Sequence, residues 1–449
     1  MKNGFEPTLS EWRDWQGQIT DFASGLGTDV MPESIGAQSI PGIVEEPLTG
    51  GLSQILALLH EGCAEAMGTT AAGYLAYVPG GGIKSSALAG FIGNLMNRFT
   101  GIESHAPMLI SLENSVLNWL CDEFGLPTGA FGIFTSGGSI ANLTALMAMR
   151  VHALGKSGDF SKAIIYVSDQ VHHSVKKSAF LAGFPPENCV AIATDSAFKL
   201  SMPALAAQLK QDRANGLRPI GVVGSAGTTN TGAIDPFEDI ALLCRAESLW
   251  FHVDAAYGGA FVLCEDGKKR LRGISMADSI TFDPHKGMFL PYGTGCLLVK
   301  DREALLRIHT YQADYLANCD INSPASLGPE LSREFRGLRL WLPLILHGAG
   351  AFRQALGEKL ALTHWLDEQL RQLPIEIMAK PELSTLIFKP TGTVSSEELV
   401  KRVNAFGRVY LAPTRIRGES AVRVCILSFR THLEQVQMCF EDIQLALKD

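Results

Sequence analysis

The sequence predicts an α/β fold with a mostly parallel sheet, and three observations support this prediction. Between about residue 130 and residue 300, short apolar runs alternate with segments of helical periodicity, as in strand–helix units. Several of these runs are apolar at almost every position, which is typical of parallel strands covered by helices on both faces. The chain has 449 residues, of which 46% are hydrophobic and 19% charged, so it can bury a large core. The seven expected strands are residues 130–135, 163–168, 189–193, 219–225, 249–254, 279–283 and 295–299.

The segments around this sheet divide the chain into three parts. Residues 1–72 have helical patterns, and we expect them to pack on another surface through Trp12 and Trp15. Residues 73–345 form the large domain, and residues 346–449 form a smaller C-terminal α/β domain. The elements expected in the small domain are strands at 384–389, 409–411 and 421–427, and helices at 395–404 and from residue 432.

Two helices are expected between the strands of the large domain, at residues 139–154 and 235–247. The second begins with a capping pattern, in which Asp235 suits the N-cap and Pro236 the first helical position. Glu238 would then reach back to the backbone of the cap.

Composition and charge exclude several classes of protein. The formal net charge is −8 and no basic stripe is visible, so we expect no nucleic-acid partner. The longest apolar stretches are far shorter than the roughly 20 residues needed to span a bilayer. The nine cysteines are scattered and never spaced as C-x-x-C, which indicates reduced thiols and no metal site. The first residues show no secretory signal, so we expect a cytoplasmic protein.

A glycine-rich turn follows the first expected strand. Residues 134–142 read Phe-Thr-Ser-Gly-Gly-Ser-Ile-Ala-Asn, so Gly137 and Gly138 allow close approach of the backbone and Ser139 opens a helix. A helix N-terminus of this kind can hold a phosphate group. The alternative interpretation is an ordinary glycine turn with a serine cap. No lysine follows the glycines and no G-x-G-x-x-G pattern is present, so neither a P-loop nor a dinucleotide fingerprint is predicted.

Three further side chains lie at the ends of expected strands, where ligands bind in open α/β sheets. Asp254 stands among small apolar residues, where a carboxylate is costly unless a cation faces it. Lys286 follows another apolar run, and a lysine in a partly dry site becomes a nucleophile for carbonyls. His172 follows a third strand and offers a flat ring. Taken singly, each could equally be a solvated turn or surface residue.

Together, these features match what pyridoxal phosphate requires. Lys286 would bond to the aldehyde carbon of the cofactor, and Asp254 would pair with the nitrogen of its ring. The helix N-terminus after Gly138 would take the phosphate.

The chain resembles the pyridoxal-dependent group II amino-acid decarboxylases from about residue 70 to the C-terminus. The motifs SGGSIAN, SDQVHHSV, GTTNTGAID, HVDAAYGG, ADSITFDPHKG and LSFRTH occur in the order and near the spacing of that family. The resemblance implies the aspartate-aminotransferase-like fold (fold type I) and decarboxylation of an L-amino acid to its amine. It also implies a homodimer with sites at the subunit interface, so residues 1–72 would pack on the partner.

The resemblance also assigns roles to individual residues. It makes Lys286 the Schiff-base lysine and Asp254 the partner of the ring nitrogen, with His172 stacked over the ring and able to move protons. It places Tyr77 and Gly80 in the segment that borders the substrate pocket. The other expected cofactor contacts are Gly137, Gly138, Ser139, Thr229, Ala256, Ser279, Asp283 and His285.

One departure from the family pattern leaves the reaction open. Residues 317–334 contain no tyrosine, although many family members carry one in this loop that is thought to protonate the carbanion. In related plant and insect enzymes, its loss accompanies oxidative conversion to an aldehyde. Decarboxylation remains the expected activity, with an aldehyde synthase, aminotransferase or carbon–carbon lyase, or a non-catalytic member, as alternatives.

The substrate is not determined by the sequence. Residues 103–105 lie near the expected dimer seam and are candidates to line the pocket, or equally an ordinary helix entry. The candidate partners for a substrate carboxylate are Arg333, Arg336, Arg423 and Arg430, with Arg430 preferred.

Overall fold

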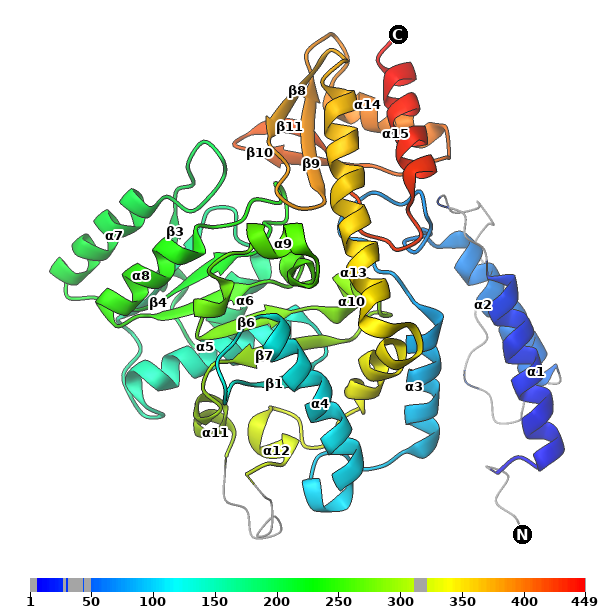
Figure 1. Cartoon of the computed structure of the whole chain (residues 1–449), viewed down its shortest axis with the longest axis horizontal. Helices are drawn as coiled ribbons and strands as arrows, with labels where there is room; N and C mark the ends of the chain where they lie inside the picture. Colours follow the sequence, from blue (N-terminus) through cyan, green and yellow to red (C-terminus); the bar gives the residue numbers. More distant parts are fainter. Residues whose placement is uncertain (1–5, 27–29, 31–42, 44–49, 311–320, 449) are drawn as a thin grey trace.

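The structure is a computed structural model that describes residues 6–26, 30, 43, 50–310 and 321–448 (Figure 1). Its large domain contains a seven-stranded sheet of order β1-β7-β6-β5-β4-β2-β3. The five strands β6, β5, β4, β2 and β3 pair in parallel in this order. Strand β7 is antiparallel to both of its neighbours, β1 and β6. Each strand lies within one residue of its expected bounds, so the predicted sheet is confirmed. The strands are β1 Phe131–Thr135, β2 Ala163–Ser168, β3 Cys189–Ile192, β4 Arg218–Ser225, β5 Trp250–Asp254, β6 Ser279–Phe282 and β7 Gly295–Val299.

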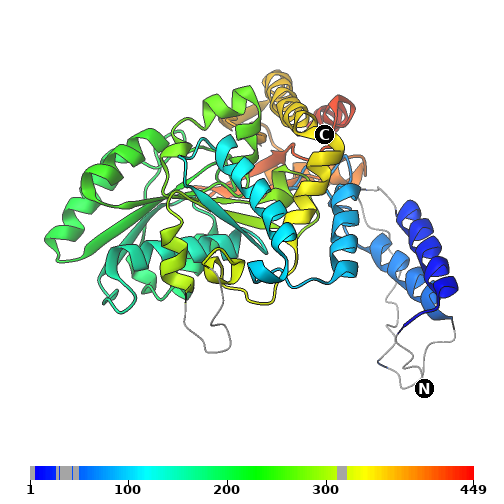
Figure 2. The ribbon, with the colours of Figure 1, turned by 60° about the horizontal axis from the view of Figure 1, so that its bottom comes forward.

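Helices cover both faces of this sheet (Figure 2). Successive residues of one strand enter different cores: Val222 packs with the helices on one face and Val223 with those on the other. This two-sided burial explains why the strand sequences are apolar at successive positions. The helices of this domain are α3 Lys84–Met96, α4 Pro107–Glu123, α5 Gly138–Leu154, α6 His173–Leu181, α7 Met202–Ala214, α8 Phe237–Glu247, α9 Glu265–Arg270, α10 Pro284–Gly287, α11 Glu303–His309 and α12 Pro324–Leu327. The short 3-10 helices are η1 Glu103–His105, η2 Pro186–Asn188, η3 Gly258–Leu263 and η4 Ile274–Met276.

The predicted cap of α8 is wrong. The helix begins at Phe237, its N-cap is Pro236, and no side chain of the described residues caps it. The carboxylate of Asp235 instead accepts the backbone N–H groups of Leu200, at 2.7 Å, and Ser225, at 2.8 Å. Asp235 is therefore buried as a link between the end of β4 and the segment before α7, and it is not available to the helix.

The small domain contains a four-stranded antiparallel sheet of order β10-β11-β9-β8. The strand expected at 409–411 begins later, at Ala412, and contains Pro413, which an edge strand tolerates. Strand β8 was not expected. Helix α13 crosses the expected domain boundary at residues 345–346 and is interrupted at Gly348, whose φ is 75°. The elements are β8 Ile375–Ala379, β9 Thr385–Pro390, β10 Ala412–Ile416, β11 Glu419–Cys425, α13 Arg336–Leu370, α14 Ser396–Ala405 and α15 Leu433–Ala446.

Tyr257, which follows β5, joins the two domains. Its buried hydroxyl lies 2.8 Å from Oγ of Ser384, the residue before β9. It also accepts hydrogen bonds of 3.0 Å from the backbone N–H of Ser384 and from Thr385 Oγ1. Three hydrogen bonds on one buried hydroxyl hold the small domain against the strand ends of the large domain.

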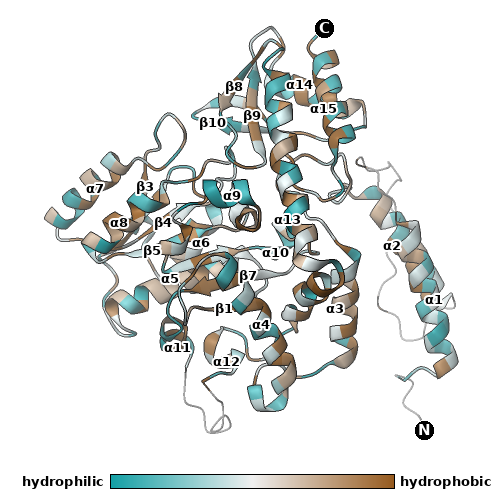
Figure 3. Cartoon of the chain, in the orientation of Figure 1, coloured by the Kyte–Doolittle hydropathy of each residue, from teal (hydrophilic) through white to brown (hydrophobic). Residues whose placement is uncertain are grey.

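The N-terminal helices lie beside the rest of the chain (Figure 1). They are α1 Leu9–Gly25 and α2 Gly51–Glu65, and none of their residues is buried. Trp12 stacks on Phe91 of α3 with ring centroids 6.4 Å apart, but Trp15 stays partly exposed. Figure 3 shows apolar residues along α2 and α3. Packing of this segment on a partner remains a prediction. Among the described residues, no helix is long and apolar enough to cross a membrane.

Candidate active site

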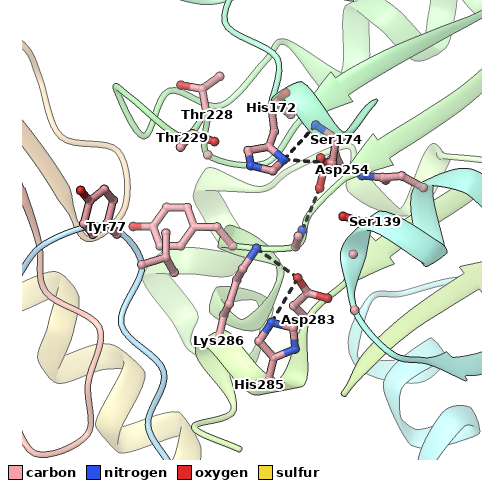
Figure 4. A pocket seen from close by; sticks show the side chains of 18 of the residues that line it. Tyr77, Ser139, His172, Ser174, Thr228, Thr229, Asp254, Asp283, His285 and Lys286 are labelled. Atoms are coloured by element: carbon pink, nitrogen blue, oxygen red, sulfur yellow. Dashed lines mark hydrogen bonds and ion pairs between the residues drawn. The ribbon is translucent and has the colours of Figure 1, made fainter. Parts of the chain in front are cut away.

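A cavity of about 460 Å³ lies at the carboxyl ends of the large-domain strands (Figure 4). The loops after β1, β2, β4, β5 and β6 form most of its wall. Val78, from the segment before α3, and Arg423, from β11 of the small domain, also line it. Most of the residues expected at the site are brought together here. These are Tyr77, Gly137, Gly138, Ser139, His172, Thr229, Asp254, Ala256, Asp283, His285 and Lys286.

Lys286 lies on the short helix α10, directly after β6. Its Nζ is 3.0 Å from Asp283 Oδ2, and Nε2 of His285 is 3.7 Å from the same oxygen. The other oxygen of Asp283 is buried and has no hydrogen-bond partner among the described residues. The amine therefore faces the cavity next to a carboxylate that retains capacity to accept a further hydrogen bond.

Asp254 ends β5 and is almost fully buried. Its Oδ2 accepts a hydrogen bond of 3.1 Å from Asn142 Nδ2, and its Oδ1 accepts one of 3.2 Å from the backbone N–H of Ala256. Both donors are neutral. A buried carboxylate is costly without a cation, so a protonated ligand ring in the cavity would supply the missing charge.

The start of α5 leaves room for a phosphate beside the backbone. The N-cap is Gly137, and the helix runs for 17 residues with its N-terminus at the cavity. A Cβ atom on Gly138 would lie 2.9 Å from Asp283 Oδ2 and 3.2 Å from the Cβ of Ala256. Glycine is therefore required at this position for the helix to approach the other loops, and its free N–H groups and dipole favour an anion.

His172 is the N-cap of α6, and its ring belongs to the cavity wall. Its Nδ1 accepts the backbone N–H of Ser174 and lies 2.7 Å from the hydroxyl of that residue. These contacts assign the hydrogen of the neutral ring to Nε2. Burial lowers the pKa of His172, and the charge of Asp254 opposes this change. The ring is thus neutral near pH 7 and suited to stacking.

Histidine burial predicts how stability depends on pH. Burial lowers the pKa of His252 and of His309 to about 4, and it also lowers that of His172. The unfolded chain takes up protons on these rings near pH ~6.5, whereas the folded chain keeps them neutral to lower pH. The free energy of unfolding should therefore decrease as the pH falls from about 6.5 to about 5. Asp235 acts in the opposite direction, because burial raises its pKa to about 6, and the net loss should be on the order of 2 kcal/mol.

Urea unfolding of the protein at these two pH values measures the difference. The variant His309→Phe removes one histidine that does not line the cavity and should reduce the pH dependence by about 1–2 kcal/mol. The same pH dependence in the variant and the wild type would contradict the assignment.

The structure does not bring three of the expected residues to the cavity. Ser279 is at the far end of β6, where its hydroxyl accepts the indole N–H of Trp250 at 2.9 Å. Gly80 packs against Tyr292, whose ring would be 3.0 Å from an added Cβ atom. Arg430 donates hydrogen bonds to the backbone carbonyls of Thr70, Gly81 and Gly82, so it holds the segment that borders the cavity mouth.

Arg423 is the arginine that the structure places in the cavity wall. It is 4% exposed, and its Nε and Nη2 have no hydrogen-bond partner among the described residues. The other two candidates are engaged elsewhere, Arg333 with Glu113 and Arg336 with Glu330. The sequence signal was an arginine inside the apolar run of β11, but the pattern alone does not show which ligand it faces.

These residues fit pyridoxal phosphate. The cavity combines a glycine-lined helix N-terminus, an accessible lysine amine, and a buried carboxylate that accepts hydrogen bonds from the neutral donors Asn142 and Ala256. Asn142, which orients that carboxylate, was not among the expected site residues, although it belongs to the motif at residues 134–142.

Comparison with known proteins identifies the family. Residues 69–391 match the model of the pyridoxal-dependent decarboxylase conserved domain. Aromatic-L-amino-acid decarboxylase of Bacillus atrophaeus is 34% identical over 378 residues, which cover 81% of this chain and 78% of the relative. Phenylacetaldehyde synthase of Arabidopsis thaliana is 28% identical, covering 83% of this chain and 81% of the relative.

A solved structure shows the same fold. The crystal structure of Oryza sativa TDC with PLP and tryptamine superposes with a TM-score of 0.90 at 23% identity, covering 98% of this chain and 99% of that one. This likeness confirms the predicted fold type I. The chain therefore belongs to the pyridoxal-dependent decarboxylases, a family of carboxy-lyases whose cofactor is pyridoxal 5'-phosphate.

Proposed function

We propose that this protein decarboxylates an L-amino acid, with aromatic L-amino acids as the first class to test, and releases the amine and carbon dioxide. The observation that carries this proposal is the convergence of Lys286, Asp254 and His172 on one cavity. The name of the Bacillus atrophaeus relative supports the aromatic class.

The residues of the chain have separate tasks in this proposal. When bound, pyridoxal phosphate supplies an electron-withdrawing ring that accepts the electron pair left by the departing carbon dioxide. Asp254 keeps a proton on the ring nitrogen, and this fixed charge lowers the barrier by electrostatic preorganisation. Lys286 holds the aldehyde carbon between turnovers, and the N-terminus of α5 holds the phosphate. His172 covers the ring and carries the Nε2 hydrogen towards the cavity.

Arg423 is proposed to bind the carboxylate of the substrate. A buried guanidinium with free donors is costly, and a carboxylate satisfies it in a planar, two-pronged geometry. Fixing this carboxylate orients the bond that must break relative to the ring.

Leucine in place of Arg423 should therefore reduce kcat/KM by about 10–100-fold, largely through KM, because a charge-assisted hydrogen bond is lost. Steady-state kinetics with the cofactor-saturated variant measure this change. Arg415→Leu is the matched control, since Arg415 is exposed on the adjacent strand β10 and should leave both constants unchanged. Equal kinetics of R423L and wild type would remove Arg423 from the site.

An aldehyde synthase is the second candidate. The sequence of residues 317–334 contains no tyrosine, and the structure describes this loop from residue 321 onward. The Arabidopsis thaliana relative is a phenylacetaldehyde synthase. Two tyrosines, Tyr311 and Tyr315, precede this loop, and they also lie outside the described residues.

The two reactions differ in every product except carbon dioxide. The purified holoenzyme is incubated with each common L-amino acid, and carbon dioxide, amine, aldehyde, ammonia, peroxide and oxygen consumption are followed together. Equal amounts of amine and carbon dioxide without oxygen uptake support the decarboxylase. Aldehyde, ammonia and peroxide with consumption of oxygen would establish the synthase in its place.

We also propose a cytoplasmic homodimer. No residue of α1 or α2 is buried, and Ile19 and Leu59 are among their exposed apolar side chains, which supports packing on a second copy. The described cysteines are all free thiols, as expected in a reducing compartment. Light scattering should give twice the chain mass of 48.4 kDa, and a mass of one chain would contradict the dimer.

A further inference from the structure

A chain of buried hydrogen bonds runs beneath the cavity and ends at its walls. Along β5, Trp250, His252 and Asp254 point to the same face of the sheet, because side chains alternate along a strand. On β6, Ser279 is the register partner of His252. Asn142 of α5 covers this face, so five polar side chains meet between a sheet and a helix.

The contacts connect these side chains in series. The indole N–H of Trp250 donates to Ser279 Oγ at 2.9 Å, and Ser279 Oγ lies 2.8 Å from His252 Nδ1. His252 Nε2 lies 3.0 Å from Asn142 Oδ1.

The chain branches at the amide nitrogen of Asn142. Nδ2 donates to Asp254 Oδ2 at 3.1 Å and to Ser174 Oγ at 3.4 Å. The hydroxyl of Ser174 in turn lies 2.7 Å from Nδ1 of His172. Asn142 therefore contacts Asp254, which is assigned to the ring nitrogen of the cofactor. It also contacts Ser174, which supports the ring of His172.

The partners determine the direction of every hydrogen bond. Asp254 accepts, so Asn142 must turn its amide N–H groups towards it and its carbonyl towards His252. His252 Nε2 must then carry a hydrogen, and Nδ1 must accept in the neutral ring. Ser279 fits this role, because its oxygen accepts from Trp250 and its own hydrogen is free for Nδ1. Burial lowers the pKa of His252 to about 4, so the ring is neutral at pH 7.

A competing arrangement lies close by. The backbone carbonyl of Ser279 is 3.1 Å from His252 Nδ1 and would accept a hydrogen from it. In that tautomer Nε2 would present a lone pair to the carbonyl of Asn142. The amide would then have to reverse and turn its oxygen towards the Asp254 carboxylate, which is unfavourable. The hydroxyl of Ser279 selects the tautomer that keeps the amide in the productive orientation.

We propose that the Trp250–Ser279–His252–Asn142 chain is a positioning device that fixes Asp254 and His172 together around the cofactor. None of the first three residues lines the cavity, so they act only through Asn142. The proposal rests on the role of Asp254 opposite the ring nitrogen. It assigns a task to Ser279 that differs from phosphate contact.

Substitution of His252 tests this device. The variant His252→Phe removes the donor to Asn142, whereas His252→Gln retains an N–H group at a similar reach. We expect His252→Phe to weaken binding of pyridoxal phosphate to the apoprotein by about tenfold and to lower kcat by a similar factor, with little change in KM. The visible absorption of its bound cofactor should also shift, and His252→Gln should restore most of the binding and the spectrum.

Ser279→Ala provides a second variant that removes a single oxygen, in case the larger change prevents folding. It should favour the competing tautomer and change cofactor affinity and spectrum in the same direction. His309→Phe is the matched control, since this poorly exposed histidine is not part of the chain and its variant should bind the cofactor as the wild type does. Urea unfolding of each apoprotein reports any general loss of stability.

The outcomes separate this inference from the proposed function. If His252→Phe and Ser279→Ala lower only the stability of the apoprotein, and binding, spectrum and kcat of the loaded enzyme are unchanged, the chain is merely structural and the proposal is wrong. If Asp254→Asn changes cofactor binding and spectrum but the His252 variants do not, the role of Asp254 stands and the positioning device fails. If Asp254→Asn also has no effect, the assignment of Asp254 and this inference fall together.

Discussion

Alanine in place of Lys286 should lower the rate of product formation by at least about 10³-fold and abolish covalent attachment of the cofactor. The amine of Lys286 faces the cavity 3.0 Å from Asp283, and the cavity wall includes no second lysine among the described residues. Reduction of the holoenzyme with borohydride followed by peptide mass mapping should place the label on residue 286 in the wild type. The variant should carry no label.

Lys300→Ala is the control for this experiment. Lys300 follows β7 and lies near Asp278, outside the cavity, so its loss should change neither labelling nor turnover. Label on another lysine in the wild type, or retained label in K286A, would overturn the assignment of the site.

Asparagine in place of Asp254 should lower kcat by at least about 10²-fold, because it keeps the shape of the side chain and removes its charge. The ring nitrogen would then lose the negative charge that keeps it protonated. Steady-state kinetics measure the loss, and the absorption spectrum of the bound cofactor should change with it. Both readouts are needed, since a loss of affinity alone would lower the rate at limiting cofactor.

Asp212→Asn separates this effect from the general cost of changing a buried acid. Asp212 is buried on α7, where it accepts hydrogen bonds from Tyr166 and Gln208, and it is not part of the cavity wall. Its variant should be less stable but should keep its kcat once saturated with cofactor. Equal kcat values for D254N and wild type would contradict the proposed role of Asp254.

The large sheet was predictable because burial on both faces leaves a strong local pattern of apolar runs. The convergence of the candidate site residues was predictable for a related reason, since polar residues directly after such runs meet at one edge of a parallel sheet. Asp254 and Lys286 are examples, separated by 32 positions in sequence but facing the same cavity.

The differences between the expectations and the structure concern side chains whose partners come from distant segments. Asp235 has the sequence context of a helix cap, but Leu200 and the end of β4 bind its carboxylate. Ser279 begins the strand that leads to Lys286, but it lies at the opposite end from the cavity. Arg423 and Arg430 are close in sequence, and only the packing of the small domain shows that the first faces the cavity and the second the backbone of residues 70–82.

The junction at Tyr257 has a consequence for how small molecules reach the interior. Because its phenol is held by Ser384 and Thr385, parting the domains at this point would break three buried hydrogen bonds at once. Substrate is therefore expected to enter, and product to leave, past the exposed Tyr77 and not by separation of the two domains. Substitutions at this entrance are therefore expected to change which amino acids can enter without breaking the hydrogen bonds of Tyr257 between the two domains.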